Sequence, residues 1–167
     1  MIEKKIFITL GSQKFQFNRI LKEIDLLIEN NFIDPKNVFA QIGSSNYNPI
    51  HFKFTKFLTM ENFKTKIENS DIIITHGGTG AIISSLKCEK VVIAIARLQK
   101  FNEHIDDHQI QIIDAFTFGN YILGTSNEKD ILNLIKKSMT HTFCKYESNT
   151  EHFLNNLNCE IRKMMDI

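Results

Sequence analysis

The sequence contains little cysteine, with three residues among 167. Cys88, Cys144 and Cys159 are odd in number and widely spaced, and none of them belongs to a C-x-x-C pair. This pattern argues against a disulfide framework and against a structural zinc site. We therefore expect a protein of the reducing cytoplasm.

Neither sign of charge dominates, because 20 lysines and arginines face 19 acidic residues and the formal net charge is +1. No basic cluster exceeds a few residues, so no surface of the chain is expected to follow a nucleic-acid backbone. The first apolar run, residues 6–10, is far too short for a signal or a membrane span. Membrane contact is therefore expected only at the periphery or through a partner, and no nucleic-acid partner is expected.

Glycine is scarce as well, and two common glycine motifs of nucleotide sites are missing. The turn after the first predicted strand holds only Gly11, so the G-x-G-x-x-G fingerprint is absent, and no G-x-x-x-x-G-K-[ST] occurs. These absences exclude a dinucleotide site of the NAD type and a P-loop ATPase.

Apolar runs typical of buried strands alternate along the chain with segments of helical periodicity. We expect strands at residues 5–10, 38–42, 71–75, 91–96 and 120–123, and a further extended segment at 52–57. Helices are expected at residues 17–30, 60–69, 80–87, 105–119 and 128–137. This alternation predicts an α/β fold with a Rossmann-like, doubly wound parallel sheet in residues 1–140. Residues 141–167 would form a C-terminal helical extension that packs on the domain or docks a partner.

The most informative stretch is residues 71–81, DIIITHGGTGA. A β-branched strand ends here in a glycine turn that opens a helix, so backbone N–H groups at the helix N-terminus can approach an anion closely. Thr79 can add a hydroxyl and His76 a ring nitrogen. The stretch predicts a phosphate site, and the alternative is a tight turn whose glycines serve only the backbone geometry.

Residues 97–109, RLQKFNEHIDDHQ, gather polar side chains where another strand meets a helix, namely Glu103, His104, Asp106, Asp107, His108 and Gln109. These side chains are suited to hydrogen bonds with a sugar or nucleotide. Alternatively, His104 and His108 could bind a metal with Glu103 or Asp107, as in a metal-dependent hydrolase. A third interpretation is a capped helix start in which an aspartate complements the helix dipole.

The sequence resembles the donor-binding half of split glycosyltransferases in four stretches: IFITLGSQKFQFNRILKEID, VFAQIGSSNY, DIIITHGGTGAII and RLQKFNEHIDDHQIQI. Similar proteins are bacterial capsular or exopolysaccharide transferase subunits and the catalytic-side subunit of the two-part N-glycan N-acetylglucosaminyltransferase. Both are similar to the C-terminal domain of glycosyltransferase family 28. The resemblance covers about residues 5–123.

This resemblance implies one half of a GT-B fold that binds a UDP-sugar and transfers a hexose, with inversion, to a polyprenyl-diphosphate-linked saccharide. It implies no cofactor and no bound metal. It also implies a membrane-attached subunit that carries the acceptor site and keeps the chain at the inner face of the membrane, and self-association is an option when that subunit is absent. The chain length agrees, since 167 residues supply one Rossmann-like domain and a GT-B enzyme needs two.

Carried over residue by residue, the resemblance assigns nucleotide-sugar contacts to the ends of three strands and the helix after the glycine turn. The residues are Gly11, Ser12, Gln13, His76, Gly77, Gly78, Thr79, Gly80, Ser84, Arg97, Asp107, His108 and Gln109. A general base must take the proton of the acceptor hydroxyl. Glu103 and His104 are the candidates within this chain, although the partner subunit can supply the base.

Ser84 departs from the family pattern, which usually has a glutamate at this position that binds the uridine ribose. A serine can form one hydrogen bond there, but it cannot hold two ribose hydroxyls as a carboxylate can. The alternative function is therefore a non-catalytic regulatory subunit of the same fold with weakened donor binding.

Overall fold

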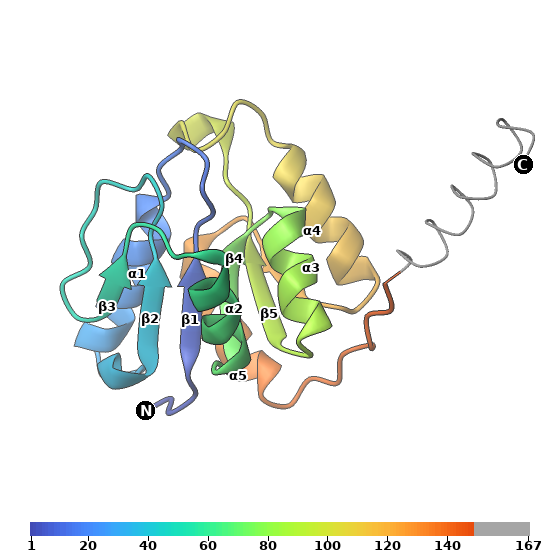
Figure 1. The fold of residues 1–167 in the computed structure, drawn as a ribbon, viewed down its shortest axis with the longest axis horizontal. Helices are drawn as coiled ribbons and strands as arrows, with labels where there is room; N and C mark the ends of the chain where they lie inside the picture. Colours follow the sequence, from blue (N-terminus) through green and yellow to red (C-terminus); the bar gives the residue numbers. More distant parts are fainter. Residues whose placement is uncertain (149–167) are drawn as a thin grey trace, which may run out of the picture.

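The computed structural model describes residues 1–148, which form a single parallel sheet with helices on both faces (Figure 1). Its strands, in spatial order, are β3 (Lys53–Thr55), β2 (Val38–Gln41), β1 (Ile6–Thr9), β4 (Ile72–His76), β5 (Val91–Ile95) and β6 (Leu123–Thr125). Every neighbouring pair is parallel, and the central pair aligns Ile8 with Ile74. The α/β, Rossmann-like fold class predicted from the sequence is confirmed.

Two layers of helices cover this sheet. Helices α1 (Asn18–Glu29) and α5 (Ile131–Ser138) contribute Ile20, Ile24 and Ile135 to the core on one face. On the other face lie α2 (Met60–Glu68), α3 (Thr79–Lys87) and α4 (His108–Phe118). Because both faces are covered, β1 and β4 are buried along their whole length, which explains their continuous apolar runs.

The strand order reverses between β1 and β4, and this switch point determines where a ligand crevice forms. From β1 the chain continues to β2 on one side, whereas β4 leads to β5 on the other. The loops that follow β1 and β4 therefore diverge at the carboxyl edge of the sheet and leave a crevice between them. Gly11 enters the first of these loops with φ 73°, a left-handed conformation that suits glycine.

Three local predictions need correction. The helix expected at 105–119 begins only at His108, because Ile105 lies in the preceding loop, where it is 71% exposed. The last strand is Leu123–Thr125 rather than 120–123, since Asn120 takes a left-handed φ of 56° in the turn after α4. Residues 128–130 form a 3₁₀ turn before α5 instead of its first turn.

The C-terminal extension predicted at 141–167 lies largely outside the described residues. Residues 141–148 are irregular, and the backbone N–H of Cys144 donates to the Asn120 carbonyl over 2.9 Å. The division of the chain at residue 140 stays a prediction. Within residues 1–148, no helix is long and apolar enough to cross a membrane.

Candidate functional site

A groove of about 440 Å³ lies at the carboxyl edge of the sheet, where the loops after β1 and β4 diverge. Seven of the predicted nucleotide-sugar contacts line it: Gly11, Ser12, Gln13, His76, Gly78, Gly80 and Ser84. The remainder of the wall includes Leu58, Met60 and Phe63, which offer an apolar surface. A larger hollow of about 730 Å³ lies at the opposite edge of the sheet, away from the glycine turn, and its lining includes Ile2, Asp71 and Leu132. The groove therefore combines the glycine turn with space for a ligand.

The N-terminus of α3 opens into this groove. Gly78 is its N-cap and provides no side-chain hydrogen bond to the first turn. The first hydrogen bond of the helix runs from the Ile82 N–H to the Gly78 carbonyl. The backbone N–H groups of Thr79, Gly80 and Ala81 therefore have no acceptor within the helix. Unpaired amides together with the positive end of the helix dipole make an anion site.

The imidazole of His76 lies between two glycines beside this helix. A Cβ on Gly78 would approach the His76 Nε2 to 2.3 Å, and one on Gly11 would lie 2.7 Å from its Cε1. Both glycines are therefore needed to admit the ring. Burial lowers the pKa of His76 to about 4, and the positive charge of Arg97 acts in the same direction. At neutral pH the ring is uncharged and can donate or accept one hydrogen bond.

Arg97 lies beneath the loop after β1 and does not line the groove. Its side chain is fully buried, and Nη2 donates to the carbonyls of Leu10 and Phe15 over 2.6 and 3.4 Å. Within residues 1–148 its Nε and Nη1 have no hydrogen-bond partner. Burial lowers the pKa of Arg97 to about 10, opposed by the charge of Glu103. Arg97 therefore holds the 11–16 loop in place through its hydrogen bonds to the Leu10 and Phe15 carbonyls.

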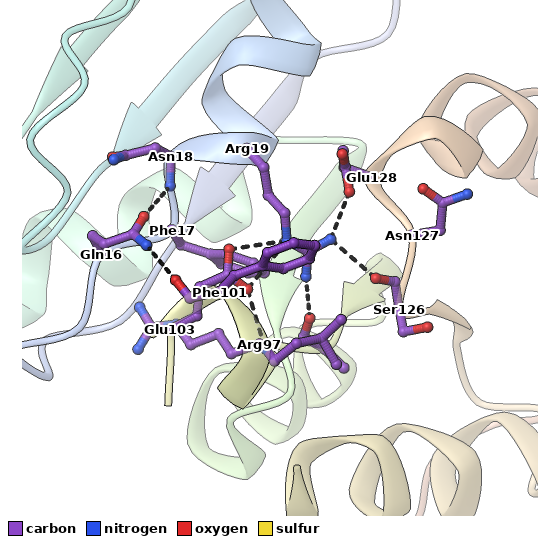
Figure 2. A network of polar contacts seen from close by, with 12 residues as sticks. Gln16, Phe17, Asn18, Arg19, Arg97, Phe101, Glu103, Ser126, Asn127 and Glu128 are labelled. Atoms are coloured by element: carbon purple, nitrogen blue, oxygen red, sulfur yellow. Dashed lines mark hydrogen bonds and ion pairs between the residues drawn. The ribbon is translucent and has the colours of Figure 1, made fainter. Parts of the chain in front are cut away.

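Glu103, a candidate base, belongs to a polar network centred on Arg19 (Figure 2). The Arg19 Nε lies 2.9 and 3.1 Å from the two carboxylate oxygens of Glu103, and the backbone N–H of Leu98 donates to the same carboxylate. Arg19 also donates to Glu128 and to the carbonyls of Ala96 and Ser126. The Glu103 carboxylate is therefore occupied, and it does not line the groove.

Gln109 connects the ends of β4 and β5 from inside the protein. Its Oε1 accepts hydrogen bonds from the backbone N–H groups of Gly77 and Arg97, over 3.1 and 3.2 Å. A Cβ on Gly77 would come within 2.7 Å of the Gln109 Cβ. The Gly77 amide is thus already paired, and the anion site is built from the residues that follow it.

The imidazoles of His104 and His108 both contact the carboxylate of Asp106. The sequence predicts Glu103 or Asp107 as their carboxylate partner instead. The His104 Nδ1 lies 3.0 Å from Asp106 Oδ1, and the His108 Nδ1 contacts the same oxygen. Hydrogen bonds from His108 hold the pKa of Asp106 below its ordinary value. Asp107 instead accepts from the backbone N–H of Gln99 over 2.8 Å. These residues do not line the groove, although the His104 ring packs on Phe15 in the 11–16 loop.

The profile of the glycosyltransferase family 28 C-terminal domain matches residues 5–159. The chain belongs to this family. Part of the sequence is 39% identical over 67 residues to the UDP-N-acetylglucosamine transferase subunit ALG13 of Candida albicans, covering 40% of this chain and 22% of that protein. A second relative is a UDP-N-acetylglucosamine--N-acetylmuramyl-(pentapeptide) pyrophosphoryl-undecaprenol N-acetylglucosamine transferase of Prochlorococcus marinus, 24% identical over 87% of this chain and 46% of the enzyme. The matched segment thus covers less than half the length of either relative.

Solved structures agree on the fold of this family 28 domain. An NMR solution structure of ALG13 superposes with a TM-score of 0.59 at 20% identity, covering 93% of this chain and 94% of that one. The glycotransferase of kitacinnamycin gives a TM-score of 0.60 at 13% identity, over 83% of this chain but only 35% of the other. The sheet and its helices are therefore similar to a GT-B glycosyltransferase domain.

Proposed function

We propose that this chain is the UDP-sugar-binding, catalytic-side subunit of a two-component inverting glycosyltransferase. The observation that carries the proposal is the groove in which the glycine turn and the uncapped N-terminus of α3 meet. Membership of family 28 supports a transferase role. The Candida relative is named a transferase subunit, which supports the need for a second subunit.

The diphosphate of the donor would lie against the first turn of α3, in contact with the amides of Thr79, Gly80 and Ala81. As the bond to the sugar breaks, negative charge grows on the UDP leaving group, and the helix N-terminus stabilises that charge. The neutral ring of His76 would add one hydrogen bond from the floor of the groove. No metal is required for this step, because the amides and the helix dipole face the developing charge.

His104 is the stronger of the two base candidates within this chain. Glu103 is held by Arg19 and the Leu98 amide, whereas the His104 Nδ1 faces the Asp106 carboxylate at 3.0 Å. A carboxylate in this position fixes the orientation of the imidazole. The acceptor-binding partner is the other source of the base.

The acceptor in this proposal is a polyprenyl-diphosphate-linked saccharide held by a membrane-attached partner, which would keep the chain at the inner face of the membrane. The transferred group would be a hexose. Synthesis of a capsule or exopolysaccharide is the context that the sequence resemblance favours, and it stays a prediction.

Ser84 favours a second candidate function, a regulatory subunit with weakened donor binding. The side chain is exposed on α3 and lines the groove beside Gly80, where a ribose following the diphosphate would lie. Its single hydroxyl forms fewer hydrogen bonds with a ribose than a carboxylate does. Weak UDP binding without turnover, even with the partner present, would favour this second function.

Replacing Gly80 by valine is expected to weaken UDP binding at least tenfold without unfolding the domain. A Cβ on Gly80 meets no protein atom within 4 Å, and valine suits a helix no worse than glycine does. The added side chain would instead occupy the space of the diphosphate. Calorimetric titration with UDP measures the loss, and circular dichroism checks the fold.

Ala115→Val is the matched control, because Ala115 is also an exposed small residue on a helix, far along α4 from the groove. Its UDP affinity should equal that of the wild type. UDP affinity within twofold of the wild type in Gly80→Val would contradict the placement of the diphosphate at α3.

A further inference from the structure

The loop between β5 and α4 brings together three side chains with metal-binding chemistry, His104, Asp106 and His108. We propose that they form a site for a divalent transition metal such as Zn²⁺ or Co²⁺. The three side chains do not line the donor groove. A metal ion bound by them would engage His104, which leaves the general base of the transferase to the partner subunit.

The geometry of the three side chains is that of a ligand set. One potential ligand atom from each of them lies within 4.8 Å of the other two. The rings of His104 and His108 meet edge to face with their centroids 4.9 Å apart. The spacing is H-x-D-x-H, so the three ligands come from five consecutive residues. His104 and Asp106 lie in the loop before α4, and His108 is the first residue of that helix.

The three side chains already share one carboxylate oxygen. Asp106 Oδ1 faces the Nδ1 atoms of both imidazoles, and the one on His104 lies 3.0 Å away. A ring nitrogen that faces a carboxylate oxygen needs a proton or a cation between the two atoms, since otherwise two acceptors face each other. A divalent metal ion can displace these protons and take the same three side chains as ligands.

The donor atoms select the class of metal. Two imidazole nitrogens and one carboxylate oxygen suit zinc, cobalt, nickel or copper, whereas magnesium and calcium prefer sites made of oxygen alone. The side chains of Asp106 and His108 are about half exposed, at 51% and 48%, so the metal can enter from solvent and water can complete its coordination.

His104 is held in position by neighbouring residues before any metal binds. The His104 side chain is only 7% exposed, and its ring packs on Phe15 with the centroids 5.2 Å apart. The backbone N–H of His108 donates to Asp106 Oδ1 over 3.1 Å, which ties the start of α4 to the same carboxylate. A metal ion at this point would join the loop before α4 to the helix itself.

The test is a Co²⁺ titration of the full chain after treatment with EDTA, followed by visible absorption and then by displacement with Zn²⁺. We expect d–d bands that saturate at one equivalent and disappear when Zn²⁺ is added. His108→Asn and Asp106→Asn should each weaken Co²⁺ binding at least tenfold. Both side chains are exposed, so the variants should retain the circular dichroism spectrum of the wild type.

His51→Asn is the matched control. His51 is also exposed, and its backbone N–H also donates to a carboxylate, that of Asp25, over 2.9 Å. This variant should bind Co²⁺ as the wild type does. The proposal is overturned if no saturable d–d band appears, if the affinity is unchanged in His108→Asn and Asp106→Asn, or if a thiolate charge-transfer band shows that cysteine is the ligand. UDP binding plays no part in this readout, so failure here leaves the proposed function standing.

Discussion

Arg19→Met is expected to lower the free energy of unfolding by about 3 to 5 kcal/mol, because it leaves the buried carboxylate of Glu103 without the guanidinium that is hydrogen-bonded to both of its oxygens. The Glu103 side chain is only 2% exposed, and Arg19 donates to both of its oxygens. The substitution also removes the hydrogen bonds to the carbonyls of Ala96 and Ser126 (Figure 2). Urea unfolding at pH 7, followed by circular dichroism, measures the change.

Two further variants separate the buried charge from the loss of packing. Lys64→Met removes the exposed ion pair with Glu68 and should change the free energy of unfolding by less than about 0.5 kcal/mol. The double variant Arg19→Met/Glu103→Leu should recover part of the loss, since no carboxylate is then left buried without Arg19, although the buried Arg97 loses the charge of Glu103. A loss below about 1 kcal/mol in Arg19→Met would contradict the role of Arg19 as the centre of this network.

Acidification from pH 7 to 4.5 is expected to cost the fold about 2.5 kcal/mol through His76 alone. The pKa of His76 is lowered from 6.5 to about 4, chiefly by burial. Above pH 6.5 the ring is neutral in the folded and unfolded chains, and the full stability is present. Between pH 6.5 and 4 the unfolded chain binds a proton that the folded chain does not, so stability falls as the pH falls.

The difference between the wild type and His76→Asn isolates this contribution, because the carboxylates titrate in both proteins. The free energy of unfolding of the variant should fall less steeply between pH 7 and 4.5, by about 2.5 kcal/mol over the range. An NMR titration should also find the His76 ring of the folded wild type neutral down to about pH 4. Parallel stability profiles of the two proteins, or a ring that titrates near pH 6.5, would contradict the burial of His76.

The fold could be predicted from the sequence because its signals are local. Continuous β-branched runs identified β1, β4 and β5, and apolar residues at helical spacing identified α1. The ends of elements were less predictable. Ile105 fits the helical period of α4, but the loop that holds Glu103 and Asp106 continues to His108, and tertiary contacts decide that boundary.

The position of the groove could be predicted from the glycines of the turn. The roles of side chains that the fold buries could not be predicted. Gly78 and Gly80 line the groove as expected, because a strand, a glycine turn and a helix start are consecutive in the sequence. The pairing of Arg19 with Glu103 spans 84 residues, and no local pattern indicates it. The resemblance assigns Arg97 a nucleotide-sugar contact, and no local pattern indicates its burial beneath the 11–16 loop.

The central claim is that UDP binds in the groove at the N-terminus of α3, and amide chemical shifts test it most directly. A ¹⁵N–¹H correlation titration of the chain with UDP, beside ADP, reports every amide at once. We predict that UDP causes the largest shifts, and larger ones than ADP, at Gly11, Ser12, Gln13, Thr79, Gly80 and Ala81. Equal shifts with both nucleotides, no saturable shifts, or shifts centred on the hollow around Ile2 and Asp71 at the opposite edge would contradict the claim.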